Sequence, residues 1–258
     1  MSWRQQNAEW EQVLRQLPPG PALPCPYYAG RASRCREFAW DADIPPPLFA
    51  RALEVGYRRC GNVYYQPACA DCHACTAYRL AVAHFRPDRS MRRTLHRNAD
   101  VVSRFGPPRL TAAKAALYLR YQRCRHPEPR PADPAGKPSS DALTLLRQMG
   151  FQMYCHPTDT VEQELWLGER LLGFSILDVA PPHVSAVYSV FEPTEPARGL
   201  GTLAILRAIA WTREQGHAYF HLGFHLAGHP KMDYKARFQP AEVLDAASGQ
   251  WRPYPAPA

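Results

Sequence analysis

Three cysteines spaced two residues apart are the clearest chemical signature in the sequence. They are Cys69, Cys72 and Cys75. This spacing lets several thiolates converge on one metal ion or iron–sulfur cluster, and the set needs a fourth ligand. The candidates for that ligand are, in order, Cys25 in its rigid Pro-Cys-Pro turn, Cys60 and His73. The spacing does not separate zinc from an iron–sulfur cluster, and buried structural thiols or a reactive thiol remain alternatives.

A run of arginines after Pro87 is the second such feature. If a helix begins at Arg89, its basic residues fall at i, i+3, i+4, i+7 and i+8 and share one face. They are Arg89, Arg92, Arg93, His96 and Arg97. Like charges on one face repel each other by roughly a few tenths of a kcal/mol per adjacent pair, and phosphates would neutralise them. The pattern predicts a nucleic-acid contact, with a solvated helix face as the alternative.

A glycine-containing loop follows an expected strand that ends at Phe191 and precedes an apolar helix. The loop contains Arg198, Gly199 and Gly201. Glycines at a helix N-terminus expose backbone N–H groups, which bind phosphate together with the helix dipole. The loop resembles the R-x-x-G-x-G pyrophosphate loop of the acetyltransferase superfamily, although Leu203 replaces the second glycine. A plain turn before a helix is equally compatible with these residues.

The segment 231–238 alternates charged and apolar residues, which is typical of a strand. The charged side of this expected strand carries Lys231, Asp233, Lys235 and Arg237. The apolar side carries Met232, Tyr234, Ala236 and Phe238. Glycines and a proline just upstream shape a loop beside the segment. It is therefore interpreted either as an anion-binding wall near an active site or as a solvent-facing edge strand.

Length and composition limit what can position these groups. The chain has 258 residues, 46% of them hydrophobic, so it can fold as one large or two small domains. Its formal net charge of +8 makes an acidic partner, such as nucleic acid, plausible. Its 27 prolines predict many rigid loops. No signal peptide or membrane-spanning run is expected, so we expect a soluble cytoplasmic protein whose eight cysteines stay reduced.

The order of expected elements predicts an α/β (α+β) fold with a mixed sheet. The first part combines helices with short aromatic strands in a Cys-rich region, and the second part reads strand, strand, strand, helix, strand. The expected helices span 3–17, 47–56, 112–123 and 200–215, with another from Arg89, and the main strands span 63–65, 78–85, 164–166, 171–179, 185–191 and 217–224. The predicted domains are 1–126 and 141–258, separated by a proline-rich loop or linker at 127–140.

Taken together, these motifs resemble the bacterial aspartate/glutamate leucyltransferases, relatives of the eukaryotic arginyl-tRNA–protein transferases. The resemblance extends over residues 24–241 and depends on the order and spacing of many short pieces rather than on any single one. These pieces are 25–28, 56–59, 64–75, 85–93, 97–100, 117–126, 185–188, 191–193, 200–202, 222–224 and 231–238.

The resemblance implies an enzyme that moves an amino acid from aminoacyl-tRNA to a protein N-terminus that begins with Asp or Glu, which marks the protein for degradation by the N-degron route. The second half would be acetyltransferase-like (GNAT-like) and use tRNA in place of acetyl-CoA, without ATP. The thiols implied to hold an iron–sulfur cluster or zinc are Cys25, Cys69, Cys72 and Cys75.

The resemblance also suggests roles for the other residues. The cations expected to bind the acidic first residue are Lys231, Lys235 and Arg237, with Arg58 and Arg59 as partners. A backbone N–H near Tyr188 or the Tyr234 hydroxyl would stabilise the oxyanion, and Glu192 or Asp233 would orient the amine. The residues expected to contact tRNA are Arg89, Arg92, Arg93, Arg97, Arg198, Gly199 and Gly201.

Two departures from the family pattern bear on specificity. The proline-rich stretch 127–140 replaces an Asp-Gly-x-Met-Tyr-like segment, and the loop 223–230 lacks the usual tyrosine and cysteine. An arginyl rather than a leucyl donor is therefore an alternative. An acetyl-CoA-dependent N-acyltransferase and a metal-stapled RNA-binding module without transfer activity are the alternatives from other functional classes.

Overall fold

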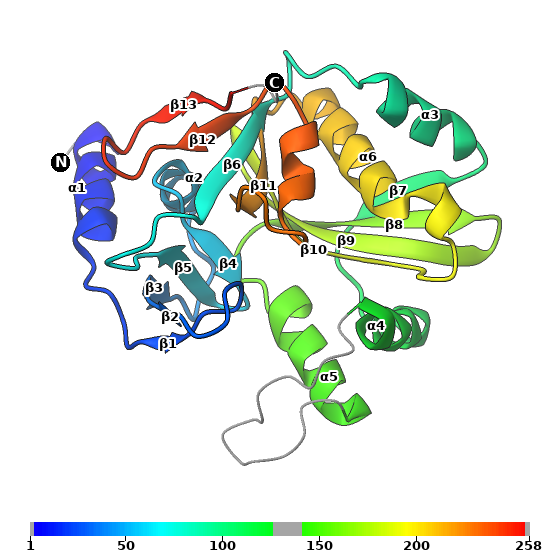
Figure 1. Ribbon diagram of the computed structural model, residues 1–258, viewed down its shortest axis with the longest axis horizontal. Coiled ribbons are helices and arrows are strands. Elements are labelled where there is room, and N and C mark those ends of the chain that lie inside the picture. Colours follow the sequence, from blue (N-terminus) through cyan, green and yellow to red (C-terminus); the bar gives the residue numbers. More distant parts are fainter. Residues whose placement is uncertain (1–2, 126–140, 256–258) are drawn as a thin grey trace.

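An eight-stranded mixed sheet forms the centre of the molecule (Figure 1). The computed structural model describes residues 3–125 and 141–255. The strand order is β13-β12-β6-β11-β10-β9-β8-β7, and every neighbouring pair is antiparallel except β10 and β11. The strands are β6 (Thr76–Ala81), β7 (Val102–Gly106), β8 (Thr160–Leu167), β9 (Arg170–Ala180), β10 (His183–Phe191), β11 (Tyr219–His225), β12 (Glu242–Leu244) and β13 (Trp251–Pro253).

Helices cover both faces of this sheet (Figure 1). One face packs against α6 (Leu200–Glu214), with α3 (Arg89–Arg97) lying on α6. The other face packs against α4 (Ala112–Arg125), α5 (Ala142–Met149) and the short π-helix η1 (Gly150–Tyr154). Because β9 is covered on both sides, it is buried at nearly every position and its sequence is mostly apolar.

A smaller helical and sheet layer formed by the first 67 residues packs beside the large sheet (Figure 1). Its three-stranded sheet has the order β3 (Cys35–Ala39), β5 (Val63–Pro67), β4 (Arg58–Cys60). The other elements are α1 (Trp3–Gln16), α2 (Pro46–Glu54), β1 (Leu23–Pro24) and β2 (Ala32–Ser33). Apolar side chains from α1, α2, β3 and β5 form its core, with Phe38 stacked on Tyr64.

The structure confirms most predicted elements. Helices α2, α3, α4 and α6 and strands β8 to β11 lie within a few residues of their expected positions, and the large mixed sheet of an α/β fold is present. The predicted division at 127–140 does not separate the sheet, because β6 and β7 precede it and pair with strands that follow it. The proline-rich segment itself lies outside the described residues.

The strand predicted at 231–238 is wrong. This segment forms the 3-10 helix η3 (Asp233–Arg237). In a 3-10 helix, side chains at i and i+3 share a face, so Lys235 and Phe238 both point inward and are 4% and 2% exposed. The alternation of charged and apolar residues imitates a strand, but the charged residues do not share one side.

Candidate active site where two parallel strands separate

The candidate site lies where β10 and β11 stop pairing. These parallel strands pair only over His183–Ser185 and Tyr219–His221. Immediately beyond, each strand shifts register against its outer neighbour, between Ala186 and Tyr188 on β10 and between His221 and Gly223 on β11. Such irregularities re-aim side chains and release backbone groups from the ladder. We call this place the divergence point.

Arg58 extends from β4 into the divergence point. Its Nη1 donates to Ser185 Oγ at 2.7 Å, and its Nη2 donates to the carbonyl of Ala186, the first residue of β10 beyond the paired stretch. Gly223 on β11 packs against this guanidinium, and its φ of +84° is a backbone conformation that favours glycine. These contacts thus hold the guanidinium against the sheet at the divergence point.

Lys235 approaches from η3 and contacts β11 in the same way. Its Nζ donates to the carbonyl of Phe224 and lies 3.7 Å from Met232 Sδ, both of which are neutral groups. Burial, reinforced by the charge of Arg58, lowers the pKa of Lys235 to about 7. Each of the separating strands therefore has a carbonyl that accepts a hydrogen bond from a buried cation, from Arg58 on β10 and from Lys235 on β11.

Neither cation has an anionic partner. Among the described residues, no carboxylate lies within 4.0 Å of Arg58 or Lys235, although both are at least nine-tenths buried. Burying a charge without a partner is unfavourable, so a buried charged group is usually paired with an opposite charge or bound to a ligand. The pair is suited to bind a carboxylate or another small anion.

Tyrosines from several elements surround these cations. Tyr234 on η3 is 45% exposed. The Tyr188 hydroxyl on β10 accepts a hydrogen bond from Gln122 Nε2 at 2.9 Å. The pKa of Tyr121 on α4 is raised to about 12, mainly by burial and next by its electrostatic interaction with Tyr188. A similar interaction with Tyr234 adds to the shift. The hydroxyls of Tyr121, Tyr188 and Tyr234 therefore lie in one neighbourhood.

Asp233 lies at the start of η3, beside the site. Its Oδ1 is 3.1 Å from Nε2 of the buried His225, and its side chain is 48% exposed. Its predicted role in orienting the amine remains a prediction. Tyr188 and Tyr234 likewise keep their predicted roles toward the oxyanion.

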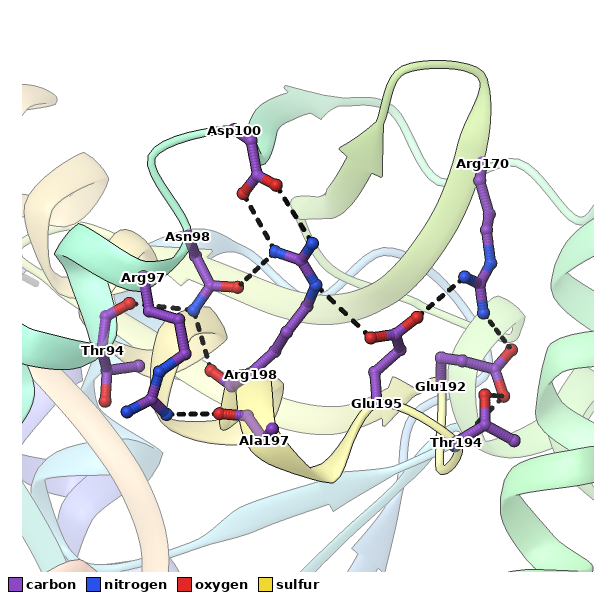
Figure 2. A network of polar contacts seen from close by, with 10 residues as sticks. All are labelled: Thr94, Arg97, Asn98, Asp100, Arg170, Glu192, Thr194, Glu195, Ala197 and Arg198. Atoms are coloured by element: carbon purple, nitrogen blue, oxygen red, sulfur yellow. Dashed lines mark hydrogen bonds and ion pairs between the residues drawn. The ribbon is translucent and has the colours of Figure 1, made fainter.

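Glu192, which was predicted to orient the amine, lies against charged and polar side chains at the end of β10. It is 4% exposed, and its Oε2 lies 2.8 Å from Arg120 Nη2. Its Oε1 accepts from the Thr194 hydroxyl at 3.0 Å (Figure 2). Burial opposes its ionisation, but the bonds from Arg120 and Thr194 lower its pKa overall. The carboxylate therefore bonds within the protein at the end of β10, and its role in orienting the amine remains a prediction.

Arg59, which was predicted to help bind the substrate, is buried in a network of bonds within the protein. Its guanidinium makes a bidentate pair with Asp178 on β9, at 2.8 and 2.6 Å, and both side chains are at most 1% exposed. Its Nη1 also donates to the carbonyls of Gly61 and Cys155. This pair attaches β4 to the large sheet, which argues against the predicted contact of Arg59 with the substrate.

The glycine loop is held by a polar network (Figure 2). Arg198 makes a bidentate pair with Asp100 at 2.9 and 3.0 Å and lies 3.4 Å from Glu195. Asn98 donates to the carbonyl of Arg198. The charge of Arg198 is therefore balanced inside the protein, which argues against its predicted contact with tRNA phosphate.

The two glycines of the loop have local packing roles. Gly199 has a φ of +64°, which glycine adopts without strain, and it lies next to Thr94 of α3. A Cβ at Gly201 would lie 3.1 Å from the Phe191 ring. Their predicted contacts with tRNA remain predictions.

The arginine surface of α3 is exposed and adjoins the site. Asp88 Oδ1 accepts from the Met91 amide at 2.7 Å and caps the helix, while Met91 is buried. The predicted RNA-contacting residues Arg89, Arg92, Arg93 and Arg97 are exposed. Arg237 at the end of η3 lies 3.4 Å from the Ser90 hydroxyl on α3. The exposed Lys231 precedes η3. The basic surface and the helix that carries Lys235 are thus neighbours.

The thiols gather near one another. The pKa of Cys75 is raised to about 12. Burial is the largest cause, followed by electrostatic interactions with Cys25, Cys72, Cys69 and Cys35, in that order. Cys35 begins β3 and was not expected in this group, because it stands apart from the repeated cysteine spacing. The Cys69 sulfur also accepts from the Arg34 amide at 3.4 Å.

These thiols supply the donor type that zinc and iron–sulfur centres use. Within residues 3–125 and 141–255, no three cysteine, histidine or acidic side chains are arranged around one ion. The predicted metal set remains a prediction.

Comparison of the sequence with known families shows the class of the protein, which is an aminoacyltransferase. The model of the C terminus of arginine-tRNA-protein transferase matches residues 113–245, and the model of its N terminus matches residues 23–93. The chain belongs to the arginine-tRNA-protein transferase family.

Individual relatives specify the branch. An aspartate/glutamate leucyltransferase of Leptospira interrogans is 37% identical over 242 residues, covering 94% of this chain and 91% of the relative. Proteins of the same description from Gluconacetobacter diazotrophicus and Stenotrophomonas maltophilia are 40% and 39% identical, covering 90% and 86% of this chain and 85% and 87% of theirs.

Solved structures give weaker similarity. FemX matches with a TM-score of 0.42 and 8% identity, over 75% of this chain and 64% of that one. L-PGS from Bacillus licheniformis matches with a TM-score of 0.43 and 12% identity, over 72% and 52%. In the described part of the chain, no helix has both the length and the apolar character that a bilayer crossing requires.

Proposed function

We propose that this protein transfers leucine from leucyl-tRNA to the N-terminal Asp or Glu of other proteins. The observation that carries this proposal is the pair of buried cations, Arg58 and Lys235, at the divergence point, neither of which has a carboxylate partner among the described residues. An acidic side chain supplies the missing anion. The relatives named aspartate/glutamate leucyltransferase support both the donor and the acceptor.

The reaction is an aminolysis. The acceptor α-amine attacks the carbonyl carbon of the ester that joins leucine to the tRNA 3′ ribose, the ester C–O bond breaks, and an amide forms. The amine loses a proton, and the ribose oxygen gains one. An ester is converted into a more stable amide, so no ATP is required.

Positioning supplies most of the acceleration. A free α-amino group has a pKa of about 7.7 to 8.0, so a useful fraction is neutral near pH 7. Holding that amine against the ester replaces an encounter in solution, and this effect can be worth several orders of magnitude. We assign Asp233 to orient the amine, and a backbone N–H near Tyr188 or the Tyr234 hydroxyl to stabilise the oxyanion.

The acceptor and the tRNA approach from adjoining surfaces. Arg58 and Lys235 bind the acidic side chain, while Lys231 and Arg237 lie exposed at the edge of η3. The arginines of α3 bind tRNA phosphate. The Arg237–Ser90 contact supports this arrangement, because one RNA molecule lying on α3 also lies beside η3.

The separated parallel strands support an acetyltransferase-like fold in which the acyl group lies at the divergence point. The polar network around Arg198 disfavours acetyl-CoA as the donor. Asp100 and Glu195 neutralise the arginine that would otherwise attract a pyrophosphate, and they bring negative charge to its loop.

The cysteine group is the place for a zinc ion or an iron–sulfur cluster, held by Cys25, Cys69, Cys72 and Cys75. Such a centre would brace the loops near β5 and η3 rather than take part in the transfer. Metal analysis of protein purified without oxygen tests this idea, since a protein that contains neither iron nor zinc would make the thiols purely structural. The product, with leucine at its N-terminus, would enter a degradation route in the cytoplasm.

The decisive experiment measures transfer from labelled leucyl-tRNA and arginyl-tRNA to peptides that differ only in their first residue. We expect leucine transfer to peptides starting with Asp or Glu and little transfer to those starting with Asn or Gln. In Arg58→Gln, this preference should fall at least about tenfold, because a charge-assisted hydrogen bond is lost. An unchanged preference in Arg58→Gln would overturn the assignment of the acceptor site.

A further inference from the structure

A buried chain of polar side chains lies behind Arg58. Glu54 ends α2, His183 begins β10 and His221 lies in β11. Glu54 Oε1 is 2.9 Å from His183 Nε2, and His183 Nδ1 is 3.1 Å from His221 Nε2. The two histidines are 1% and 2% exposed. The chain is therefore nearly closed to water, except at Glu54.

The hydrogen bonds restrict where the protons lie. Burial opposes ionisation of Glu54, but the bond from His183 and the charge of Arg79 lower its pKa overall. An ionised carboxylate only accepts hydrogen bonds, so His183 Nε2 carries a proton. Burial, followed by the charges of His183, Arg58 and Arg79, keeps the pKa of His221 well below its ordinary value, so His221 is neutral.

These constraints leave two arrangements of the histidine pair. In the first, His183 is neutral and its Nδ1 accepts from the Nε2–H of His221. In the second, the pair has gained one proton, so His183 donates through Nδ1 and His221 carries its own proton on Nδ1 instead. One proton gained near Glu54 thus reverses the hydrogen bond and adds positive charge to the chain.

The chain reaches Arg58 through the divergence point. His221 is the register partner of Ser185, whose hydroxyl accepts from Arg58. Gly223, two residues further along β11, lies against the same guanidinium. His221 and Arg58 are therefore neighbours on one face of the sheet, and Arg58 contributes to the electrostatic environment of His221.

Other charged and aromatic groups enclose the chain. Arg79 pairs with Glu54 at 3.1 Å and with Glu242 at 2.7 Å, and its guanidinium lies between the rings of Tyr219 and Trp251. The titratable or charged groups that face the histidine pair are Glu54, Arg58, Arg79, His217 and Tyr219, with Glu242 behind Arg79 and Lys235 beyond Arg58.

We propose that Glu54, His183 and His221 are positioning residues that act through Arg58, and that the proton on this chain sets how tightly the acidic acceptor residue binds. The inference rests on the proposed function of Arg58. A proton gained by the pair adds positive charge behind Arg58 and strengthens its attraction for a carboxylate. By linkage, a bound carboxylate favours proton uptake by the pair to the same extent.

The direct test observes the histidine nitrogens themselves. In protein labelled with ¹⁵N-histidine, the pair is titrated between pH 8.5 and 5.5 by NMR, alone and with peptides starting with Asp or Asn. His183→Gln assigns the signals. We expect the Asp peptide, but not the Asn peptide, to shift the titration midpoint upward by about 0.7 pH unit, which equals a fivefold coupling. Equal midpoints with the two peptides, or no proton uptake by the pair in this range with either peptide, would overturn the inference.

A binding measurement supplies a second readout. The ratio of Asp-peptide to Asn-peptide affinity is measured without tRNA at several pH values, so that protonation of the α-amine affects both peptides alike. Lys235 also titrates in this range, so the comparison is between wild type and Glu54→Gln. In wild type, the ratio should rise as the pH is lowered. In Glu54→Gln, we expect this rise to be about fivefold smaller. A profile identical to wild type would contradict the proposal.

Glu242→Gln is the matched control. Glu242 makes an equivalent pair with Arg79 and is similarly exposed, but it does not touch the histidines. It should therefore keep the wild-type profile, and a change equal to that of Glu54→Gln would attribute the effect to Arg79 alone and overturn the inference. If Arg58→Gln also leaves the Asp preference intact, the proposed function fails. If only the histidine effect is missing, the proposed function stands and this inference fails.

Discussion

Replacement of Lys235 by methionine should separate stability from recognition. Methionine has a similar length and no charge, and Lys235 is 4% exposed with only neutral acceptors around it. Removing an ammonium group that the fold holds at a disadvantage should stabilise the protein. Removing a cation that binds the acceptor should weaken the acidic preference.

The pKa gives the size of the stability effect. Burial lowers the pKa of Lys235 from 10.5 to about 7. At about 1.4 kcal/mol per pH unit, the charged form is disfavoured by on the order of 5 kcal/mol, and structural relaxation reduces this to a few kcal/mol. The unfolded chain binds this proton more tightly, so the penalty is complete below pH 7 and disappears as the pH rises toward 10.5.

The assay combines unfolding with transfer kinetics. Urea unfolding at pH 7 should give Lys235→Met a higher free energy of unfolding than wild type, and the difference should shrink by pH 9.5. The KM for a peptide starting with Asp should rise at least about tenfold, while that for an Asn peptide changes little. Lys231→Met, at an exposed position, is the control and should leave stability unchanged.

Two results would refute this reasoning. If Lys235→Met is less stable than wild type at pH 7, the lysine is not a buried charge held at a disadvantage. If its KM for Asp and Asn peptides changes equally, the ammonium group does not bind the acidic side chain.

The remaining predictions address the RNA surface, the attachment of β4 and the opening of the sheet. Changing both Arg92 and Arg93 to Ala should lower the slope of log affinity against log salt for tRNA by about 2, and an unchanged slope would remove their phosphate contacts. Asp178→Asn should destabilise the fold by about 3 to 5 kcal/mol in urea, because Arg59 is left buried and unpaired; a loss under about 1 kcal/mol would contradict this. Gly223→Ala should lower stability, since a φ of +84° is strained for alanine, and a shift of β11 that relieves the strain should weaken acceptor binding beside Arg58; normal KM values would contradict this.

Local patterns in the sequence predicted the regular elements well. The arginine helix after Pro87 is capped by Asp88 and buries Met91, as its periodicity requires. The segment 231–238 was mistaken for a strand because alternation over eight residues does not distinguish a strand from a 3-10 helix. That error hid the burial of Lys235, which makes the residue chemically unusual.

Residues far apart in the sequence were the hardest to place. Arg58 and Arg59 are adjacent, and nothing local shows that one meets Asp178 while the other reaches the divergence point. Glu192 looked available until the fold brought Arg120 to it. Glu54 and the two histidines become a chain only through pairing of β10 with β11, which no local spacing records.

The two consecutive arginines of β4 attach to the large sheet by different kinds of bond. Arg59 alone carries the bidentate pair that bonds this short strand to β9, whereas Arg58 holds on through a hydroxyl and a carbonyl. A substitution of Arg58, the residue proposed to bind the acceptor, should therefore leave the Arg59–Asp178 attachment of the N-terminal layer intact. The proposed acceptor site can change in evolution while this attachment is kept.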